Sequence, residues 1–73
     1  MNKLEKLSLL EDILGVEEGT LNENLALDQI TEWDSMAVIS LIAIMDEKFG
    51  KTIPSAQIRK FKSVKDILDL MEE

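Results

Sequence analysis

The sequence predicts an all-α protein, a small four-helix bundle of three main helices and one short helix, with a long loop between the first and second helices. Three observations favour this fold class. Apolar residues recur at helical spacing in three segments. Three glycines and one proline leave few positions that interrupt a helix, and no segment has the pattern of a strand. Because 73 residues have room for one core, we expect a single domain over residues 1–73.

The first helix is predicted from Asn2 to Leu14. Asn2 is a residue type that caps helix N-termini, and Gly15 follows the last leucine, where a C-cap glycine is expected. Polar residues occupy the opposite side, which indicates an amphipathic helix with one face on the core. Its apolar stripe comprises Leu4, Leu7, Leu10, Ile13 and Leu14.

A long connector, Gly15 to Trp33, follows this helix. Its length is unusual in a compact domain and indicates either a functional loop or one with structure of its own. Thr20 and Glu23 have the spacing of a capping box, which predicts a single helical turn there. Four apolar residues are spaced so that they hold the connector against the helices: Leu21, Leu25, Leu27 and Ile30.

The second helix is predicted from Ser35 to Phe49, ended by Gly50. The face of this helix that points away from the core is poor in charged residues. Two explanations remain open, namely chance and a docking surface for another protein. The predicted core face comprises Val38, Leu41, Ile42, Met45 and Phe49, with Ile39 and Ile44 beside it. The predicted outward stripe comprises Met36, Ser40, Ala43 and Glu47.

Two more helices complete the bundle. A short one is predicted over Ala56–Lys60, after the break at Pro54, with Ser55 as its N-cap. The last begins at Ser63, because Asp66 three residues later has the spacing of a capping box. The residues expected to point inward from these two helices are Ile58, Phe61, Val64, Ile67, Leu68 and Met71.

The composition argues against catalysis by the chain itself. It contains no cysteine and no histidine, so it has no disulfide, no thiol nucleophile and no imidazole for metal binding or for proton transfer near neutral pH. We therefore expect no catalytic residue, no metal site and no enzymatic activity. Residues 1–20 lack the pattern of a signal peptide, and no apolar run is long enough to span a membrane. We expect a cytoplasmic protein without stable membrane insertion.

The net charge of −7 is unevenly distributed. Residues 1–34 hold nine acidic and two basic residues, whereas residues 35–73 hold six of each. An acidic chain repels nucleic acid and anionic membranes, so basic protein surfaces are the expected partners. The basic cluster Arg59, Lys60, Lys62 and Lys65 runs against this trend, and we interpret it as a solvated helix end.

Trp33-Asp34-Ser35-Met36 opens the most apolar helix. At a helix start the backbone N–H groups lack partners and the dipole is positive, so either Asp34 or Ser35 fits the N-cap. The same place favours an anion attached to Ser35, such as a phosphodiester. A catalytic serine needs an adjacent base, most often histidine, which the chain lacks. Ser35 is therefore a better candidate for a residue that another enzyme modifies.

The whole chain resembles the acyl carrier protein family, the phosphopantetheine-binding domains of fatty acid, polyketide and nonribosomal peptide assembly. Its size, its acidity and the long loop after the first helix all match. Residues 34–36 are similar to the family's Asp-Ser-Leu, and residues 46–50 to its acid-x-x-Phe-Gly helix end. Residues 51–54 resemble the stretch that follows this end, and residues 61–67 the closing Phe-x-Thr-Val-x-Asp-Leu.

The resemblance implies that a separate phosphopantetheinyl transferase attaches 4′-phosphopantetheine from coenzyme A to Ser35, with Asp34 helping it to recognise the site. The monomeric carrier then holds an acyl or aminoacyl thioester, which a loading ligase supplies and downstream transferases or synthases use. Partners are expected to contact Asp34, Met36, Ser40, Ala43 and Glu47.

Two departures from the family point to a specialised pathway. Ala37 and Ser40 stand where many members carry acids, so docking is expected to rely on apolar contact. Trp33 before Asp-Ser resembles the carriers of specialised pathways, D-alanyl transfer and stand-alone aminoacyl carriers among them. The alternative is a small helical interaction module, or an unmodified degenerate carrier, in which Ser35 is only a helix cap.

Overall fold

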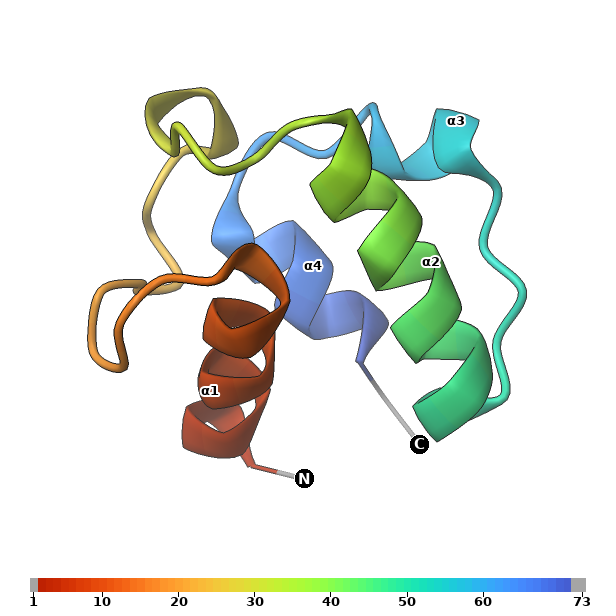
Figure 1. The fold of residues 1–73 in the computed structure, drawn as a ribbon, viewed down its shortest axis with the longest axis horizontal. Coiled ribbons are helices and arrows are strands. Elements are labelled where there is room, and N and C mark those ends of the chain that lie inside the picture. The colour runs from red at the N-terminus through yellow and green to blue at the C-terminus, as the bar shows by residue number, and fades with distance from the viewer. Residues whose placement is uncertain (1, 72–73) are drawn as a thin grey trace.

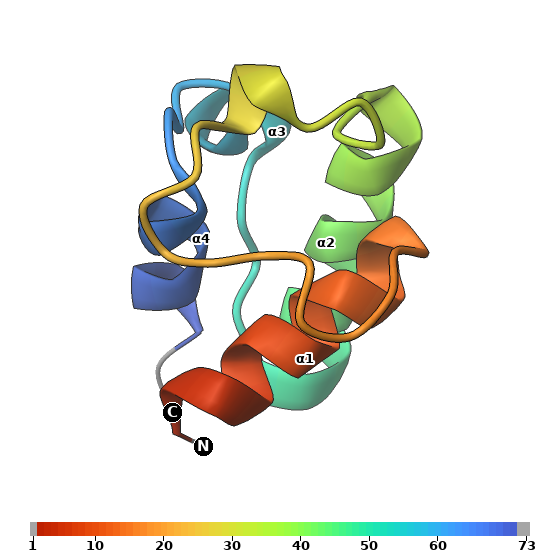
Figure 2. The same cartoon turned by 90° about the vertical axis from the view of Figure 1, so that its left-hand side faces the viewer.

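The computed structural model describes residues 2–71. Helices α1 and α2 lie side by side, α4 packs behind them, and the short α3 lies across one end (Figures 1 and 2). No strand occurs within residues 2–71, which confirms the all-α bundle of three main helices and one short helix. The elements, in order, are α1 (Lys3–Leu14), the 3₁₀ helix η1 (Leu27–Gln29), α2 (Ser35–Phe49), α3 (Ser55–Ile58) and α4 (Val64–Leu70).

Local capping signals explain where the two longest helices begin and end. The side chain of Asn2 accepts the N–H of Glu5 at 2.8 Å, and the Glu5 carboxylate accepts the N–H of Asn2 in return at 3.1 Å. This capping box satisfies N–H groups that a helix start leaves without partners. Gly15 and Gly50 end α1 and α2 in the left-handed conformation, with φ of 72° and 64°, which glycine adopts without strain.

The start of α3 differs from the prediction. Ser55 is the first helical residue rather than the cap, and Pro54 occupies the N-cap position. The carbonyl of Pro54 accepts the N–H groups of Gln57 and Ile58, so the helix begins as soon as the ring has fixed the backbone. The side chain of Ile58 is nevertheless fully buried, as predicted, and Phe61 packs partly buried against the core.

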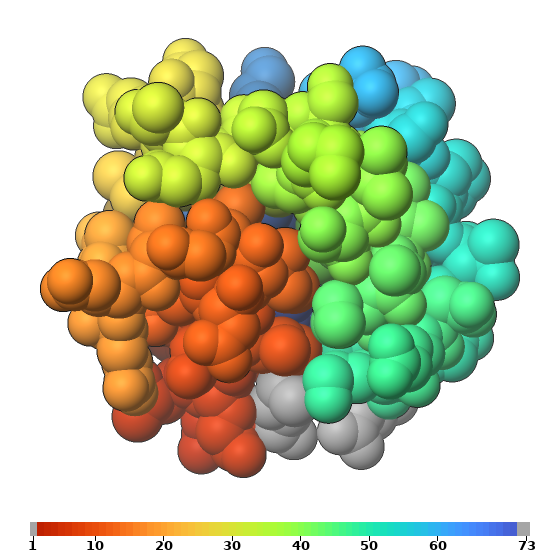
Figure 3. Space-filling view, viewed as in Figure 1, coloured from red at the N-terminus to blue at the C-terminus, as the bar shows by residue number. Residues whose placement is uncertain are grey.

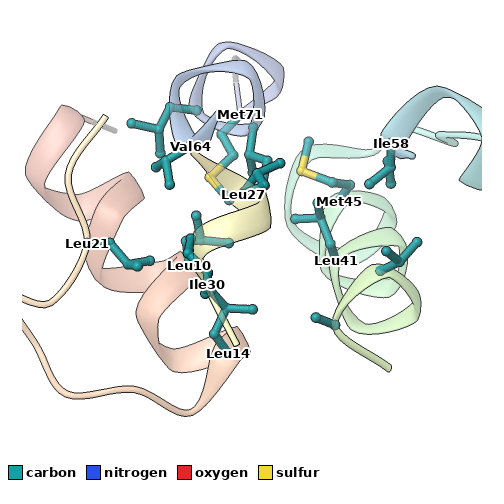
Figure 4. Packing of buried hydrophobic residues seen from close by; sticks show 14 residues of the cluster. Leu10, Leu14, Leu21, Leu27, Ile30, Leu41, Met45, Ile58, Val64 and Met71 are labelled. Atoms are coloured by element: carbon teal, nitrogen blue, oxygen red, sulfur yellow. The ribbon is translucent and has the colours of Figure 1, made fainter. Parts of the chain in front are cut away.

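The core lies where the three main helices and the connector meet (Figure 4). Two residues predicted to face it do not. Leu4 is 72% exposed at the rim of a groove between α1 and the connector, and Ile39 is 59% exposed on α2. The buried apolar residues are Leu10, Leu14, Leu21, Leu27, Ile30, Ala37, Val38, Leu41, Met45, Ile58, Val64, Ile67, Leu68 and Met71.

The connector has structure of its own, but not the helical turn predicted at Thr20–Glu23. That segment follows an irregular path because the side chain of Asn22 accepts the N–H of Asn24 at 3.0 Å, which forms a local turn instead. The helical turn lies further along, in η1. Leu21, Leu27 and Ile30 are buried and Leu25 is partly buried, so the connector is held against the helices as predicted.

Backbone hydrogen bonds join the connector to the start of α4. The N–H of Leu27 donates to the carbonyl of Lys62 at 2.9 Å, and the N–H of Val64 donates to the carbonyl of Leu25 at 3.0 Å. Ala26 and Ser63 thereby form an isolated antiparallel bridge. The connector and the segment between α3 and α4 consequently have fixed backbones. Within residues 2–71, no helix combines the length and the apolar character that crossing a bilayer requires.

The start of α4 predicts a pH dependence of stability. The Asp66 carboxylate accepts the N–H of Lys62 at 2.9 Å and of Ser63 at 3.1 Å. These bonds, that of Lys62 first, hold the pKa of Asp66 below its ordinary value. The ionised carboxylate therefore stabilises the fold above the unfolded-state pKa of about 3.9, and this contribution disappears as pH falls through the folded-state pKa.

We expect Asp66→Asn to lower the free energy of unfolding by about 1 kcal/mol near neutral pH, because a neutral acceptor caps the helix less well. The difference from the wild type should shrink below about pH 4. Urea unfolding of both proteins near neutral pH and below about pH 4 measures this difference in the free energy of unfolding. Asp69→Asn is the control, since it removes an exposed ion pair with Lys65 from the same helix. A difference for Asp66→Asn that stays constant with pH would contradict the prediction.

Candidate functional site

Asp34, not Ser35, caps α2. Its backbone is extended, and its side-chain Oδ1 accepts the N–H of Ala37 at 3.0 Å. The carbonyl of Asp34 also accepts the N–H of Val38 at 3.1 Å, which begins the helical ladder. Both residues fit this role by sequence, and the structure assigns it to Asp34 alone. The helix start therefore does not require the Ser35 hydroxyl.

Ser35 is the first residue of α2 and its side chain is exposed. Its hydroxyl forms no hydrogen bond with any residue in the range 2–71. The connector leads to Ser35 through Trp33, whose side chain packs partly buried against the core. The backbone N–H of Trp33 donates to the carbonyl of Ile30 at 3.1 Å. The hydroxyl is thus presented to solvent from a backbone that is fixed on both sides.

The start of α2 suits a phosphodiester on this hydroxyl. The first N–H groups of a helix lack intrahelical partners, and Asp34 takes only that of Ala37. Those of Ser35 and Met36 remain near the hydroxyl, at the positive end of a 15-residue helix. An anion there gains favourable interactions with these groups. The residues present therefore fit 4′-phosphopantetheine, whose phosphate would lie at the helix start.

A shallow groove of about 250 Å³ lies beside Ser35, between the end of α1 and the start of α2. Figure 3 shows these two helices, in orange and green, meeting along one face of the molecule. Apolar and acidic side chains both line the groove. Its lining residues are Ile13, Leu14, Glu32, Asp34, Met36, Ala37 and Ser40.

Three of the four residues in the predicted outward stripe of α2 are exposed. Met36 is 68% exposed, Ala43 and Glu47 are also exposed, and Ser40 is half-buried in the groove. Asp34 is exposed at the head of the same helix. The structure therefore brings all five sequence-predicted partner residues to one side of α2, continuous with Ser35.

The helix is rotated slightly from the predicted orientation. Ala37, at a position where many members of the family carry acids, is 5% exposed, and Ile39, expected beside the core, faces solvent. The reason is the position of α1, whose residues Ile13 and Leu14 line the same groove as Ala37 and so cover that side of α2. The exposed surface next to Ser35 consequently includes Met36 and Ile39, two large apolar side chains without a covering element.

Sequence reasoning missed Glu11, which shapes the connector. Only 3% of this residue is exposed, and its Oε2 accepts the N–H of Gly19 at 2.9 Å and of Leu21 at 3.0 Å. The signal was present in the sequence, since Glu11 lies on the apolar stripe of α1, four residues after Leu7 and three before Leu14. Within the described part of the chain, no three acidic residues form a group able to hold a metal ion.

The sequence is similar to those of known proteins. The family model described as "Phosphopantetheine attachment site" matches residues 7–71. An acyl carrier protein of Zymomonas mobilis is 33% identical over 60 residues, covering 82% of this chain and 77% of its own. One from Rubrobacter xylanophilus is 29% identical over 77 residues, covering 100% of this chain and 95% of its own. One from Thermosynechococcus vestitus is 30% identical, covering 93% and 85%.

No solved structure matches the chain at a significant level. The family match nevertheless extends over nearly all the described residues, from the middle of α1 to the end of α4. It includes the free serine, its capping aspartate and the groove beside them. The chain therefore belongs to the phosphopantetheine-binding acyl carrier protein family, whose prosthetic group is 4′-phosphopantetheine.

Proposed function

We propose that the Ser35 hydroxyl is the attachment point of 4′-phosphopantetheine, and that the modified protein carries an acyl or aminoacyl group between biosynthetic enzymes. The observation that carries the proposal is that different residues cap α2 and present a hydroxyl at its start. Asp34 caps the helix, which leaves the exposed Ser35 hydroxyl available for modification. When attached, the group supplies a thiol, on which a thioester forms and which the cysteine-free chain lacks.

The chain's own residues hold the site but do not activate it. Forming the phosphodiester joins the serine oxygen to the phosphorus that carries pantetheine in coenzyme A, breaks the diphosphate bond to release adenosine 3′,5′-bisphosphate, and removes the hydroxyl proton. Without histidine, the chain has no side chain that ordinarily accepts this proton near neutral pH. A separate transferase must therefore supply the base and bind coenzyme A. The chain itself catalyses no step in this proposal, and residues 1–73 act as one carrier domain.

Partner enzymes dock on the exposed side of α2 in this proposal. Asp34, Met36, Ser40, Ala43 and Glu47 lie on that side, and Ile39 extends its apolar area. Because large apolar side chains stand next to Ser35, docking of the transferase, the loading ligase and downstream enzymes should depend weakly on salt. The proximity of this surface to Ser35 places a docked enzyme beside the arm.

Incubation of the unmodified protein with coenzyme A and a broad-specificity phosphopantetheinyl transferase tests the proposal. The intact mass should increase by one phosphopantetheine, and fragmentation should locate the added mass on Ser35. A carrier protein already known to accept the group serves as the positive control. If the control is modified and this chain is not, it is a degenerate carrier and the proposal is wrong.

Asp34 offers a way to separate capping from recognition. Asp34→Asn retains an N-cap side chain and should leave the free energy of unfolding within about 0.5 kcal/mol of the wild type, whereas Asp34→Ala should lose about 1 kcal/mol. If the transferase recognises the charge, kcat/KM for modification of the Asn variant should fall about tenfold. Urea unfolding and initial rates measure the two effects. An Asn variant modified at the wild-type rate would exclude a recognition role for this carboxylate.

A further inference from the structure

Basic residues are concentrated in one stretch of the chain. Residues 48–65 contain six basic residues and no acidic residue, whereas the rest of the chain contains all 15 acidic residues and only two basic ones. Two of the six already have contacts, since Lys51 donates to the carbonyl of Leu70 at 3.0 Å and Lys65 pairs with Asp69. Four basic residues of this stretch remain, and three of them lie between α3 and α4.

Three of these cations lie within the four residues 59–62, and we call them the α3–α4 basic patch: Arg59, Lys60 and Lys62. All three are exposed, and none forms an ion pair with any residue in the range 2–71. In a chain with nearly twice as many acidic as basic residues, three cations that are close in sequence and form no ion pair within residues 2–71 are available to an anionic partner.

The backbone that carries the patch is fixed. The N–H of Phe61 donates to the carbonyl of Ile58 at 3.0 Å, the carbonyl of Lys62 accepts the N–H of Leu27 at 2.9 Å, and the Phe61 ring packs against the core. A groove of about 370 Å³ lies beside the patch. Its lining combines an apolar floor with two charges, from Ala26, Leu27, Asp28, Phe61 and Lys62.

The patch and the groove lie at the same end of the bundle as Ser35. In Figures 1 and 2, α3, the segment that follows it and η1 all stand at the end where α2 begins. Figure 3 shows the same grouping on the surface, with the cyan and blue segment next to the start of the green helix. A protein that acts on an arm attached to Ser35 would therefore have this surface within its reach.

We infer that the α3–α4 basic patch and its groove bind a short acidic segment of a partner protein, with an apolar side chain in the groove and carboxylates against Arg59, Lys60 and Lys62. The inference rests on the proposed carrier function only in assuming that the partner acts at Ser35. The carrier then has two binding surfaces of different chemistry, an apolar surface on α2 and the cationic α3–α4 basic patch.

The size of the patch selects a short segment over an extended polyanion. The three cations lie within four consecutive residues, and the rest of the chain carries a large excess of acidic residues. A membrane surface or a nucleic acid extends well beyond one Debye length, about 8 Å at physiological salt, and so meets that acidic surface. A short peptide segment contacts the patch and the groove alone.

The test measures binding of a short acetylated, amidated peptide in which glutamates flank one leucine. The phosphopantetheine-modified protein, labelled with ¹⁵N, is titrated with this peptide, and a peptide with glutamine in place of glutamate is the matched probe. We expect the acidic peptide to shift the amide signals of residues 26–28 and 59–62, and the neutral one to leave them unchanged. Replacement of Arg59, Lys60 and Lys62 together by glutamine should raise Kd about tenfold.

Lys48→Gln is the control variant, because it removes a cation of the same stretch at the opposite end of α2 and should leave binding unchanged. The inference is overturned if the acidic peptide causes no shifts, if the shifts lie elsewhere, or if the triple variant binds equally well. Binding of phosphatidylserine vesicles or a DNA oligonucleotide without peptide binding would also overturn it.

Transferase modification of the triple variant separates this inference from the proposed function. The three cations lie outside the α2 surface, so the variant should gain phosphopantetheine at the wild-type rate. If the wild-type protein is modified but does not bind the acidic peptide, the inference is refuted and the carrier function remains intact. Absence of modification in both the wild type and the variant would instead refute the attachment proposal, whether or not the unmodified protein binds the peptide.

Discussion

We expect Ser35→Ala to gain no mass on incubation with coenzyme A and a phosphopantetheinyl transferase, under conditions that modify the wild-type chain to completion. The reason is chemical, since the serine oxygen forms the new bond to phosphorus and alanine has no oxygen to replace it. The expected effect is therefore a complete loss rather than a reduced rate. Intact-mass measurement after increasing incubation times distinguishes the two.

Ser55→Ala is a matched control for this loss. Ser55 is also exposed and is also the first residue of a helix, but it begins the four-residue α3 after Pro54 instead of the long α2 after Asp34. Its replacement should leave the mass gain unchanged. If Ser35→Ala still gained one phosphopantetheine, the attachment point would lie elsewhere and the proposed site would be wrong.

Ser35→Ala also tests the interpretation of Ser35 as a helix cap. Because the Asp34 carboxylate bonds to the N–H of Ala37, removing the Ser35 hydroxyl should change the free energy of unfolding by less than about 0.5 kcal/mol. Asp34→Ala should cost more than Ser35→Ala. A loss of 1 kcal/mol or more in Ser35→Ala would assign the cap to serine, since that is the usual cost of removing one.

The helices were predictable from sequence because their signals are local. Asn2 with Glu5 and Ser63 with Asp66 lie three residues apart, and the capping glycines directly follow α1 and α2. The connector was not predictable in detail, although Thr20 and Glu23 have the same spacing. Its path depends on contacts distant in sequence, such as those of Leu27 with Lys62, which no local pattern specifies.

The candidate site divides in the same way. The identity of Ser35 and its place at the head of α2 followed from the sequence, but the choice of Asp34 as the cap did not, because both residues suit it. The rotation of α2, which buries Ala37 and exposes Ile39, depends on where α1 packs. That position is a tertiary property, and periodicity identifies which residues share a helix face but not which neighbouring helix covers them.

Glu11 is a buried acidic residue whose hydrogen bonds to the connector are expected to contribute strongly to stability. Glu11→Ala removes the acceptor from the N–H groups of Gly19 and Leu21, the latter in a buried environment. Each hydrogen bond to a charged group contributes about 1.5–3 kcal/mol, and a buried N–H left without a partner costs about 1–3 kcal/mol. We expect a loss of about 3 kcal/mol, which is large for a chain whose size predicts a total of roughly 4–11 kcal/mol.

Two variants locate the origin of this loss. Glu11→Gln keeps one neutral oxygen that can accept both N–H groups, so it should lose about half as much as Glu11→Ala. Asp12→Ala changes the next residue of α1, which is exposed and whose side chain bonds to no residue in the range 2–71, and should lose less than about 0.5 kcal/mol.

Urea unfolding gives the free energies of these variants, and amide exchange at Gly19 and Leu21 reports directly on the connector. Equal losses in the three variants would mean that α1 is sensitive to any change on its surface. A loss confined to position 11, with faster exchange at those two amides, would show that one buried carboxylate fixes the path of the connector toward Ser35.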